Sequence, residues 1–306
     1  MAGVDVRRLW RSVVSIALAG ATALTGCSQP GHPGANMVVA STDVWGSVAR
    51  AVAGRHVAVT SVLSGADADP HAYRLSPSKA AALADAALVV YNGGGYDPWV
   101  NQVLAGHPRV AAVDAYSFAA SPAPGRQPPD EHVFYDMDVA RSVAASIADR
   151  LAAIDPPNAA DYRANAARFC RAADGIAISE HAIASAYPGT AVIATEPVVH
   201  YLLAASGLVN RAPAAFTAAN ETETDPAPAD MATVLDLIEH HEVSALLVNP
   251  QTSTPAIDGL QKTAQRAGVP VTEVTETLPD GTDYLTWQRN TVNQLLAALR
   301  TTRRAP

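Results

Sequence analysis

Residues 158–187, NAADYRANAARFCRAADGIAISEHAIASAY, decide the fold of this chain. The stretch is rich in alanine, contains no proline and has one glycine, Gly175. A Pro-Pro-Asn sequence supplies a stop and an N-cap at its start, and Pro188 and Gly189 follow it. As one helix of about 28 residues it would be about 40 Å long; the alternative is two helices that break near Gly175. We predict one stiff helix that connects two halves of the molecule.

On both sides of this helix, short apolar runs alternate with longer stretches of helical spacing. The runs that predict strands are 37–41, 57–63, 87–91, 110–113, 191–195, 245–248 and 269–274. The stretches that predict helices include 44–53, 77–84, 197–206, 228–241, 255–267 and 283–300. Apolar strands that alternate with helices are typical of parallel sheets covered on both faces.

The alternation occurs in two separate blocks, so we predict an α/β fold of two parallel-sheet lobes joined by one long rigid helix. The predicted N-terminal lobe covers residues 37–157, the linking helix residues 158–188 and the C-terminal lobe residues 189–306. In open α/β sheets, ligands bind beyond the carboxyl ends of the strands. We therefore expect a site in the cleft between the two lobes.

The composition excludes several classes of protein. With 49% hydrophobic and 16% charged residues among 306, the chain is too apolar to be disordered along its length. It carries 21 basic and 29 acidic residues, whereas a nucleic-acid binder normally carries a basic patch. Two cysteines are too few for a disulfide framework or a cysteine-rich zinc site. We expect a monomer that binds no nucleic acid.

Residues 1–27 are typical of a secretory signal. Three arginines precede an apolar run at 12–24, which is shorter than the roughly 20 residues of a membrane-spanning helix. The run ends in Leu-Thr-Gly-Cys at 24–27, which resembles the lipobox of bacterial lipoproteins; the alternative is an ordinary signal peptide with an incidental cysteine. We expect export, a lipid anchor on Cys27 at the outer face of the cell membrane, and a tether at 28–36.

Residues that can bind a metal follow four of the predicted strands. They are Asp-Pro-His at 69–71, Asp-Glu-His at 130–132, Glu196 and Glu276. Because the carboxyl ends of parallel strands meet at one edge of a sheet, two of these groups in each lobe would face the cleft. Two neutral imidazoles and two carboxylates balance a divalent cation, and they suit Zn²⁺, Mn²⁺ or Fe²⁺ better than Ca²⁺ or Mg²⁺.

Other residues compete for these positions. His200 lies four residues after Glu196, about one helical turn, so both could face one metal. The acidic run at 220–225, Asn-Glu-Thr-Glu-Thr-Asp, lacks the pattern of an EF-hand loop and is interpreted as a solvated loop. The His-His pair at 240–241 ends a predicted helix, where capping is the simpler interpretation. Asn249, which also follows a strand, could orient an imidazole ligand.

Six segments carry a resemblance to a known family. They are SGADADPH at 64–71, LVVYNGGG at 88–95, DEHVFYD at 130–136, TEP at 195–197, VNPQ at 248–251 and DYL at 283–285. Through these segments the chain resembles the zinc/manganese solute-binding lipoproteins of bacterial ABC importers. The resemblance extends over about residues 38–299, nearly all of the chain after the predicted leader.

The resemblance implies that two α/β lobes clamp one divalent ion and that the ion passes to a cognate ABC permease without catalysis. The ligands that it implies are His71, His132, Glu196 and Glu276. The family usually has an aspartate at the fourth position, so Glu276 is a departure that lengthens the ligand by one methylene. Asp280 and Asp283 are the alternatives for this position.

Two other functions fit parts of the pattern. A metal-dependent hydrolase could use the same residues to activate water, although the sequence contains neither an HExxH nor a Gly-x-Ser-x-Gly motif. A binding protein for an organic or chelated solute could use the same two lobes. Carboxylate ligands and the lack of a histidine-rich loop favour manganese, whereas the intrinsic affinity order favours zinc. The sequence leaves both ions open.

Overall fold

The computed structural model describes residues 37–65, 73–119, 128–222 and 224–304. The predicted signal at 1–27 and tether at 28–36 lie outside these residues. Helix α5 (Ala159–Ala186) runs without a break through Gly175, so the prediction of one linking helix is confirmed. Its buried residues recur in alternating steps of four and three, which anchors one side of the helix in the core: Tyr162, Ala166, Phe169, Ala173, Ile176, Glu180 and Ile183.

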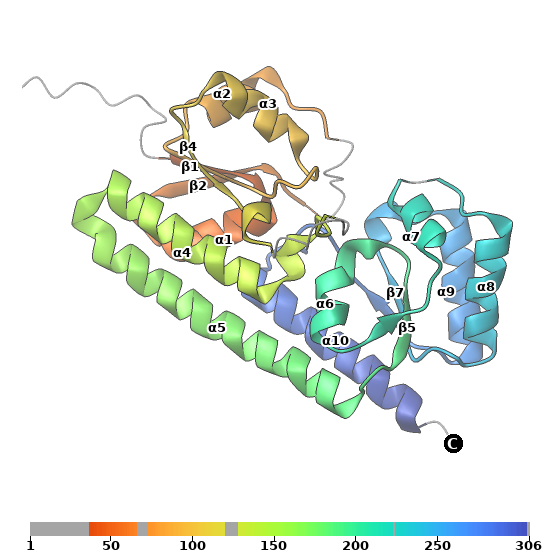
Figure 1. Cartoon of the computed structure of the whole chain (residues 1–306). Helices are drawn as coiled ribbons and strands as arrows, with labels where there is room; N and C mark the ends of the chain where they lie inside the picture. Colours follow the sequence, from red (N-terminus) through yellow and green to blue (C-terminus); the bar gives the residue numbers. More distant parts are fainter. Residues whose placement is uncertain (1–36, 66–72, 120–127, 223, 305–306) are drawn as a thin grey trace, which may run out of the picture. The chain divides into compact units, whose positions relative to one another are not determined.

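Two parallel four-stranded sheets, one before and one after α5 in the chain, confirm the predicted two-lobed α/β fold (Figure 1). The first sheet consists of β1 (Met37–Thr42), β2 (Ala58–Leu63), β3 (Leu88–Tyr91) and β4 (Ala111–Asp114). The second consists of β5 (Ala191–Ala194), β6 (Val209–Asn210), β7 (Leu246–Val248) and β8 (Val271–Glu273). Their strand orders, β2-β1-β3-β4 and β6-β5-β7-β8, give both sheets the same topology. The sequence did not predict β6, because two residues show no periodicity.

Helices connect the strands in both lobes. Besides α5 they are α1 (Asp43–Ala53), α2 (Pro77–Ala84), α3 (Pro98–Gly106), α4 (Met137–Ile154), α6 (His200–Ala205), α7 (Ala214–Glu221), α8 (Pro228–Glu239), α9 (Pro255–Ala267) and α10 (Tyr284–Arg304). The sequence did not predict α3, α4 and α7. Asp136 is the N-cap of helix α4, and its Oδ1 accepts hydrogen bonds from two backbone N–H groups of the first turn. Aspartate is a common N-cap residue, so the sequence carried a signal for the start of this helix. None of the described helices combines the length and apolar character that crossing a bilayer requires.

The central strands β1, β3, β5 and β7 are buried on both faces, as their apolar runs predict, whereas the edge strands are partly exposed. Val38 of β1 faces a core shared with α1, α4, α5 and α10, whereas Val39 faces a cluster that includes α2 and α3. In the second sheet, Val192 of β5 faces the same shared core, and Ile193 faces a cluster with α8 and α9. Figure 1 shows α5 alongside α4 and α10. The shared core makes both lobes parts of one compact unit.

Candidate metal centre

His132 is a buried histidine in the segment that follows the first sheet. It precedes the 3₁₀ turn Val133–Tyr135, and 1% of its surface is exposed. Nδ2 of Asn92, after β3, donates a hydrogen bond to the carbonyl of Glu131 at 2.8 Å and holds this segment to the sheet. Oδ1 of Asp130 accepts from both the backbone N–H and Nδ1 of His132, each at 2.9 Å. This arrangement keeps Nδ1 as a donor and leaves Nε2 as the nitrogen that can bind a metal.

The pKa of His132 is the result of opposing effects. Burial lowers it, but the hydrogen bond to Asp130 and the negative charges of Glu276, Asp130 and Glu221 outweigh burial and raise it above its usual value. Burial likewise raises the pKa of Asp130, but the hydrogen bonds and the charge of His132 outweigh it and lower that pKa. The surroundings of His132 therefore favour positive charge at this point, whether a proton or a metal ion supplies it.

Glu196 and Glu276 are two buried carboxylates at the same edge of the second sheet. They follow β5 and β8, and their exposed fractions are 3% and 5%. Asn249, which follows β7 between these strands, donates from Nδ2 to Oε2 of Glu196 at 2.8 Å and to Oε1 of Glu276 at 3.2 Å. The hydroxyl of Thr252 donates to the other oxygen of Glu196. One amide therefore holds both carboxylates, so Asn249 orients carboxylates rather than the imidazole that the sequence suggested.

The imidazole of the first lobe faces carboxylates from the second. Nε2 of His132 lies 4.0 Å from Oε2 of Glu276 and 4.0 Å from Oε1 of Glu221, the last residue of α7. Two atoms bonded to one tetrahedral ion at about 2.0–2.2 Å lie about 3.3–3.6 Å apart, so a small approach of these side chains would let them share an ion. Ligand atoms of Glu131, His132 and Glu221 also lie within 4.8 Å of one another. The group combines one imidazole with several carboxylates, which is a donor set for a divalent transition metal.

The predicted ligand His71 lies outside the described residues. Gly65 is the last described residue before it, and its backbone N–H donates to Oδ2 of Asp43 at 3.0 Å. The carbonyl of Gly65 accepts from Oγ1 of Thr277 at 2.9 Å, and Thr277 is the neighbour of Glu276 in the chain. The loop that leads toward the predicted first ligand is therefore tied to the segment that carries the predicted fourth.

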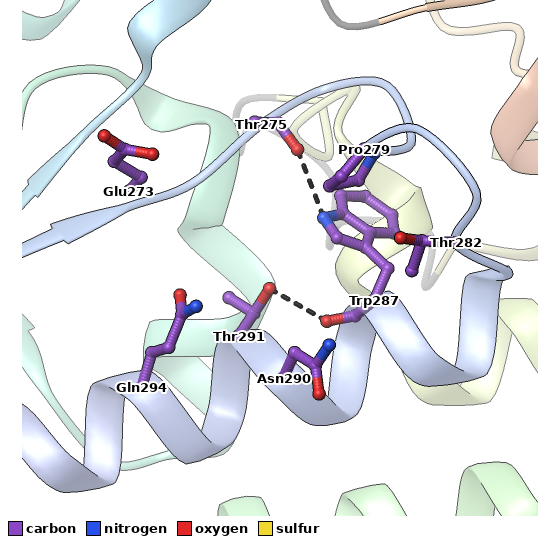
Figure 2. Close-up of a pocket in the computed structure, with 8 residues that line it drawn as sticks. All are labelled: Glu273, Thr275, Pro279, Thr282, Trp287, Asn290, Thr291 and Gln294. Atoms are coloured by element: carbon purple, nitrogen blue, oxygen red, sulfur yellow. Dashed lines mark hydrogen bonds between the residues drawn. The ribbon is translucent and has the colours of Figure 1, made fainter.

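Helix α10 contacts both of the segments that carry predicted ligands. The hydroxyl of Tyr284 donates to the carbonyl of Phe134 at 2.7 Å, in the turn that follows the buried histidine. Nε1 of Trp287 donates to Oγ1 of Thr275 at 3.1 Å, in the loop of the fourth predicted ligand (Figure 2). The hydroxyl of Tyr135 donates to the carbonyl of Thr275 at 2.9 Å. One helix thus ties the two segments together, and a cavity of about 230 Å³ lies beside the contact.

The alternatives for the predicted ligands lie at the surface. Asp283 is exposed and accepts hydrogen bonds from the backbone N–H and hydroxyl of Thr286 at the start of α10. Asp280 is exposed as well. His200 is an exposed residue at the start of α6 and lines a cavity of about 420 Å³ together with Glu196. The two aspartates are exposed surface groups, whereas the buried carboxylates of Glu196 and Glu276 share the amide of Asn249.

The interpretation of 220–225 as a solvated loop is wrong for its first two residues. Asn220 and Glu221 end helix α7, and Asn220 is fully buried. Its Nδ2 donates to the carbonyl of Thr195 at 3.0 Å, next to the second sheet's first carboxylate. The sequence held a signal for this helix, because the buried Phe216 lies four residues before Asn220 in an alanine-rich stretch.

Two parallel β/α lobes, a long linking helix and a buried histidine that faces carboxylates define a class of two-lobed solute-binding proteins. The structure is similar to the periplasmic zinc binding protein TroA from Treponema pallidum, with 17% identity, TM-score 0.70, and 86% of this chain and 99% of that chain covered. It is similar to a Mn-bound mutant of the periplasmic metal binding protein from Candidatus Liberibacter asiaticus, with 18% identity, TM-score 0.68 and coverage of 86% and 99%. It is also similar to the solute-binding protein FpvC from P. aeruginosa in complex with Ni²⁺, with 18% identity, TM-score 0.69 and coverage of 86% and 96%. At these identities the likeness shows the fold.

The sequence itself matches the model of a known protein family. The model of the family described as zinc-uptake complex component A, periplasmic, matches residues 38–298. The chain belongs to this family, which confirms the resemblance drawn from the six segments. The family consists of solute-binding proteins rather than enzymes, so the chain is not a hydrolase.

The electrostatics of Glu196 generate a prediction for the metal-free protein. Burial raises the pKa of Glu196 to about 7, hydrogen bonds from Thr252 and Asn249 act against burial, and the charge of Glu276 adds to it. Because the folded state disfavours the ionised carboxyl, Glu196 should remove stability as the pH rises from about 4.5 to about 7. Replacing it by Gln should abolish this part of the pH dependence, so the stability of the variant relative to wild type should rise as the pH increases from about 4.5 to about 7.

The measurement is the free energy of unfolding by urea, in chelator, from about pH 5 to about pH 8. Glu239→Gln, at an exposed position of α8, serves as the control for loss of a surface carboxylate. A difference between wild type and Glu196→Gln that stays constant with pH would contradict the prediction.

Proposed function

We propose that this protein captures one divalent transition-metal ion, Zn²⁺ or Mn²⁺, outside the cell membrane and delivers it to an ABC permease for uptake. The observation that carries the proposal is the spacing of two buried atoms, Nε2 of His132 and Oε2 of Glu276, which lie 4.0 Å apart. An imidazole nitrogen and a carboxylate oxygen that lie this close can bind one such ion after a small approach of the two side chains. Membership of a family described as a zinc-uptake component supports the same function.

We propose four residues as the ligands of this ion. They are His71, His132, Glu196 and Glu276. Two neutral imidazoles and two carboxylates would balance the charge of the ion. The shared contact of Glu196 and Glu276 with the amide of Asn249 supports their assignment as a pair. The hydrogen bond between the loop before His71 and the segment of Glu276 supports the first and fourth assignments together.

The choice between zinc and manganese rests on opposing chemical preferences. Carboxylate oxygens suit Mn²⁺, whereas the intrinsic affinity order of nitrogen and oxygen sites places Zn²⁺ above Mn²⁺. The names of the similar structures include zinc for TroA, Mn for the protein of Candidatus Liberibacter asiaticus and Ni²⁺ for FpvC. We propose that the site accepts both Zn²⁺ and Mn²⁺, and a competition titration of protein purified without added metal ranks the two.

The proposed ligands lead to a direct test by substitution. His71→Ala and His132→Ala should each lower the affinity for metal by about tenfold or more, because each removes one nitrogen from the ion. Circular dichroism checks the fold, and isothermal titration with Zn²⁺ and Mn²⁺ gives the affinity. His181→Ala, at an exposed position of α5, is the matched control and should bind as wild type does. Unchanged affinity in either ligand variant removes that residue from the site.

We propose further that the protein is exported and anchored by a lipid on Cys27, with residues 28–36 as the tether. The Leu-Thr-Gly-Cys sequence at the end of the apolar run supports the anchor. A tethered receptor stays near its permease at high effective concentration, so a captured ion is delivered without a search through bulk solution.

Replacement of the lipid-bearing residue tests the anchor. In Cys27→Ser the thioether cannot form, so the protein should appear in the soluble fraction or remain as an unprocessed precursor. Fractionation of cells followed by mass spectrometry of the N-terminus measures both outcomes. A Cys27→Ser protein that is still processed and membrane-bound overturns the proposal.

A further inference from the structure

We propose that Glu221, at the C-terminal end of α7, is an additional ligand that shifts the metal preference of the site toward Mn²⁺. This inference rests on the proposed function and extends it to a residue outside the four ligands of that proposal. Three independent features of Glu221 support it: its anchorage, its distance from His132 and its position at a helix terminus.

The first feature is that a rigid element holds Glu221. Helix α7 is anchored by Phe216 and Asn220, which are both fully buried. Asn220 donates to the carbonyl of Thr195, so the end of the helix is fastened beside Glu196. The hydroxyl of Thr222 donates to the carbonyls of the last helical turn, which closes the helix directly after Glu221. Sites built on such elements hold their ligands more exactly in place than solvated loops do.

The second feature is the geometry around the imidazole. Oε1 of Glu221 and Oε2 of Glu276 lie at the same distance, 4.0 Å, from Nε2 of His132. The side chain of Glu221 is 27% exposed, whereas that of Glu276 is 6% exposed. Glu221 is therefore the more exposed of two carboxylates that lie equally close to the imidazole.

The third feature is electrostatic. A carboxylate in the last turn of a helix meets the negative end of the helix dipole, which is unfavourable. Glu131 adds a further carboxylate within 4.8 Å of the same ligand atoms. A divalent cation bound here would interact favourably with the helix terminus and with these carboxylates at once. While the imidazole of His132 is neutral, the placement is unfavourable for the metal-free protein and favourable for the metal-loaded one.

The chemistry of the donors decides which ion gains most. Zn²⁺ is satisfied by four ligands and binds nitrogen well, whereas Mn²⁺ takes more ligands and prefers oxygen. A further carboxylate adds an oxygen ligand and a negative charge. Glu221 should therefore matter more for Mn²⁺ than for Zn²⁺.

The test compares Glu221→Gln with Asp225→Asn, which removes the same charge from an exposed position four residues further along. Competition titration gives the affinities for Mn²⁺ and Zn²⁺, and thermal unfolding of the metal-free proteins gives their stability. In Glu221→Gln the affinity for Mn²⁺ should fall by about tenfold or more. The affinity for Zn²⁺ should fall less, and the metal-free protein should be at least as stable as wild type. The control should leave both affinities unchanged.

Three results would overturn the proposal. The affinity for Mn²⁺ in Glu221→Gln could equal that of the control, both affinities could fall by the same factor, or the metal-free variant could be less stable, as expected for a structural residue. His132→Ala is measured alongside to distinguish a failure of the proposed role of Glu221 from a failure of the proposed function. If His132→Ala weakens binding and Glu221→Gln does not, only the role of Glu221 is lost. If neither weakens binding, the site itself is elsewhere.

Discussion

The repulsion among buried carboxylates that face one imidazole is the constraint on which the rest of this structure depends. Glu196 and Glu276 are almost fully buried, and one amide, that of Asn249, donates to both. Water cannot solvate such groups, and in a medium of low dielectric constant their mutual repulsion is stronger than at the surface. The hydrogen bonds reduce this unfavourable term, and a divalent cation would reverse its sign. The site is therefore suited to the reversible binding of a divalent cation.

The fold supplies the means to hold such charges together. Parallel strands β5, β7 and β8 end at one edge, so Glu196, Asn249 and Glu276 emerge side by side. Helix α10 contacts both segments that carry proposed ligands, through Tyr284 and Trp287. The long helix α5 shares one core with both sheets, so the lobes cannot separate without exposing apolar surface. Such a frame favours small local movements of these segments over a wide opening of the lobes.

The sequence predicted the architecture because the relevant signals are local. Neighbouring residues in the sequence are enough to recognise the proline-free stretch that ends near Tyr187, and the same holds for the apolar strands. The sequence could suggest a ligand where a metal-binding residue directly follows a strand, as the proposed ligand Glu196 does. The sequence did not suggest the proposed role of Glu221, because its place depends on α7, whose apolar face is a single Phe216 and whose anchor is a buried asparagine. The prediction that Asn249 orients an imidazole was wrong for a related reason. The neighbours of its amide depend on the order of the strands in the sheet, and hydrophobic periodicity does not reveal that order.

X-ray absorption at the metal edge of the Zn²⁺- and Mn²⁺-loaded protein, with metal analysis of the same samples, tests the central claim most directly. It reports which atoms are bonded to the ion and how many ions each chain holds. The account predicts one ion per chain, bonded to imidazole nitrogen and carboxylate oxygen, without sulfur. A spectrum that lacks imidazole, or protein that retains no ion after removal of the excess, would contradict it.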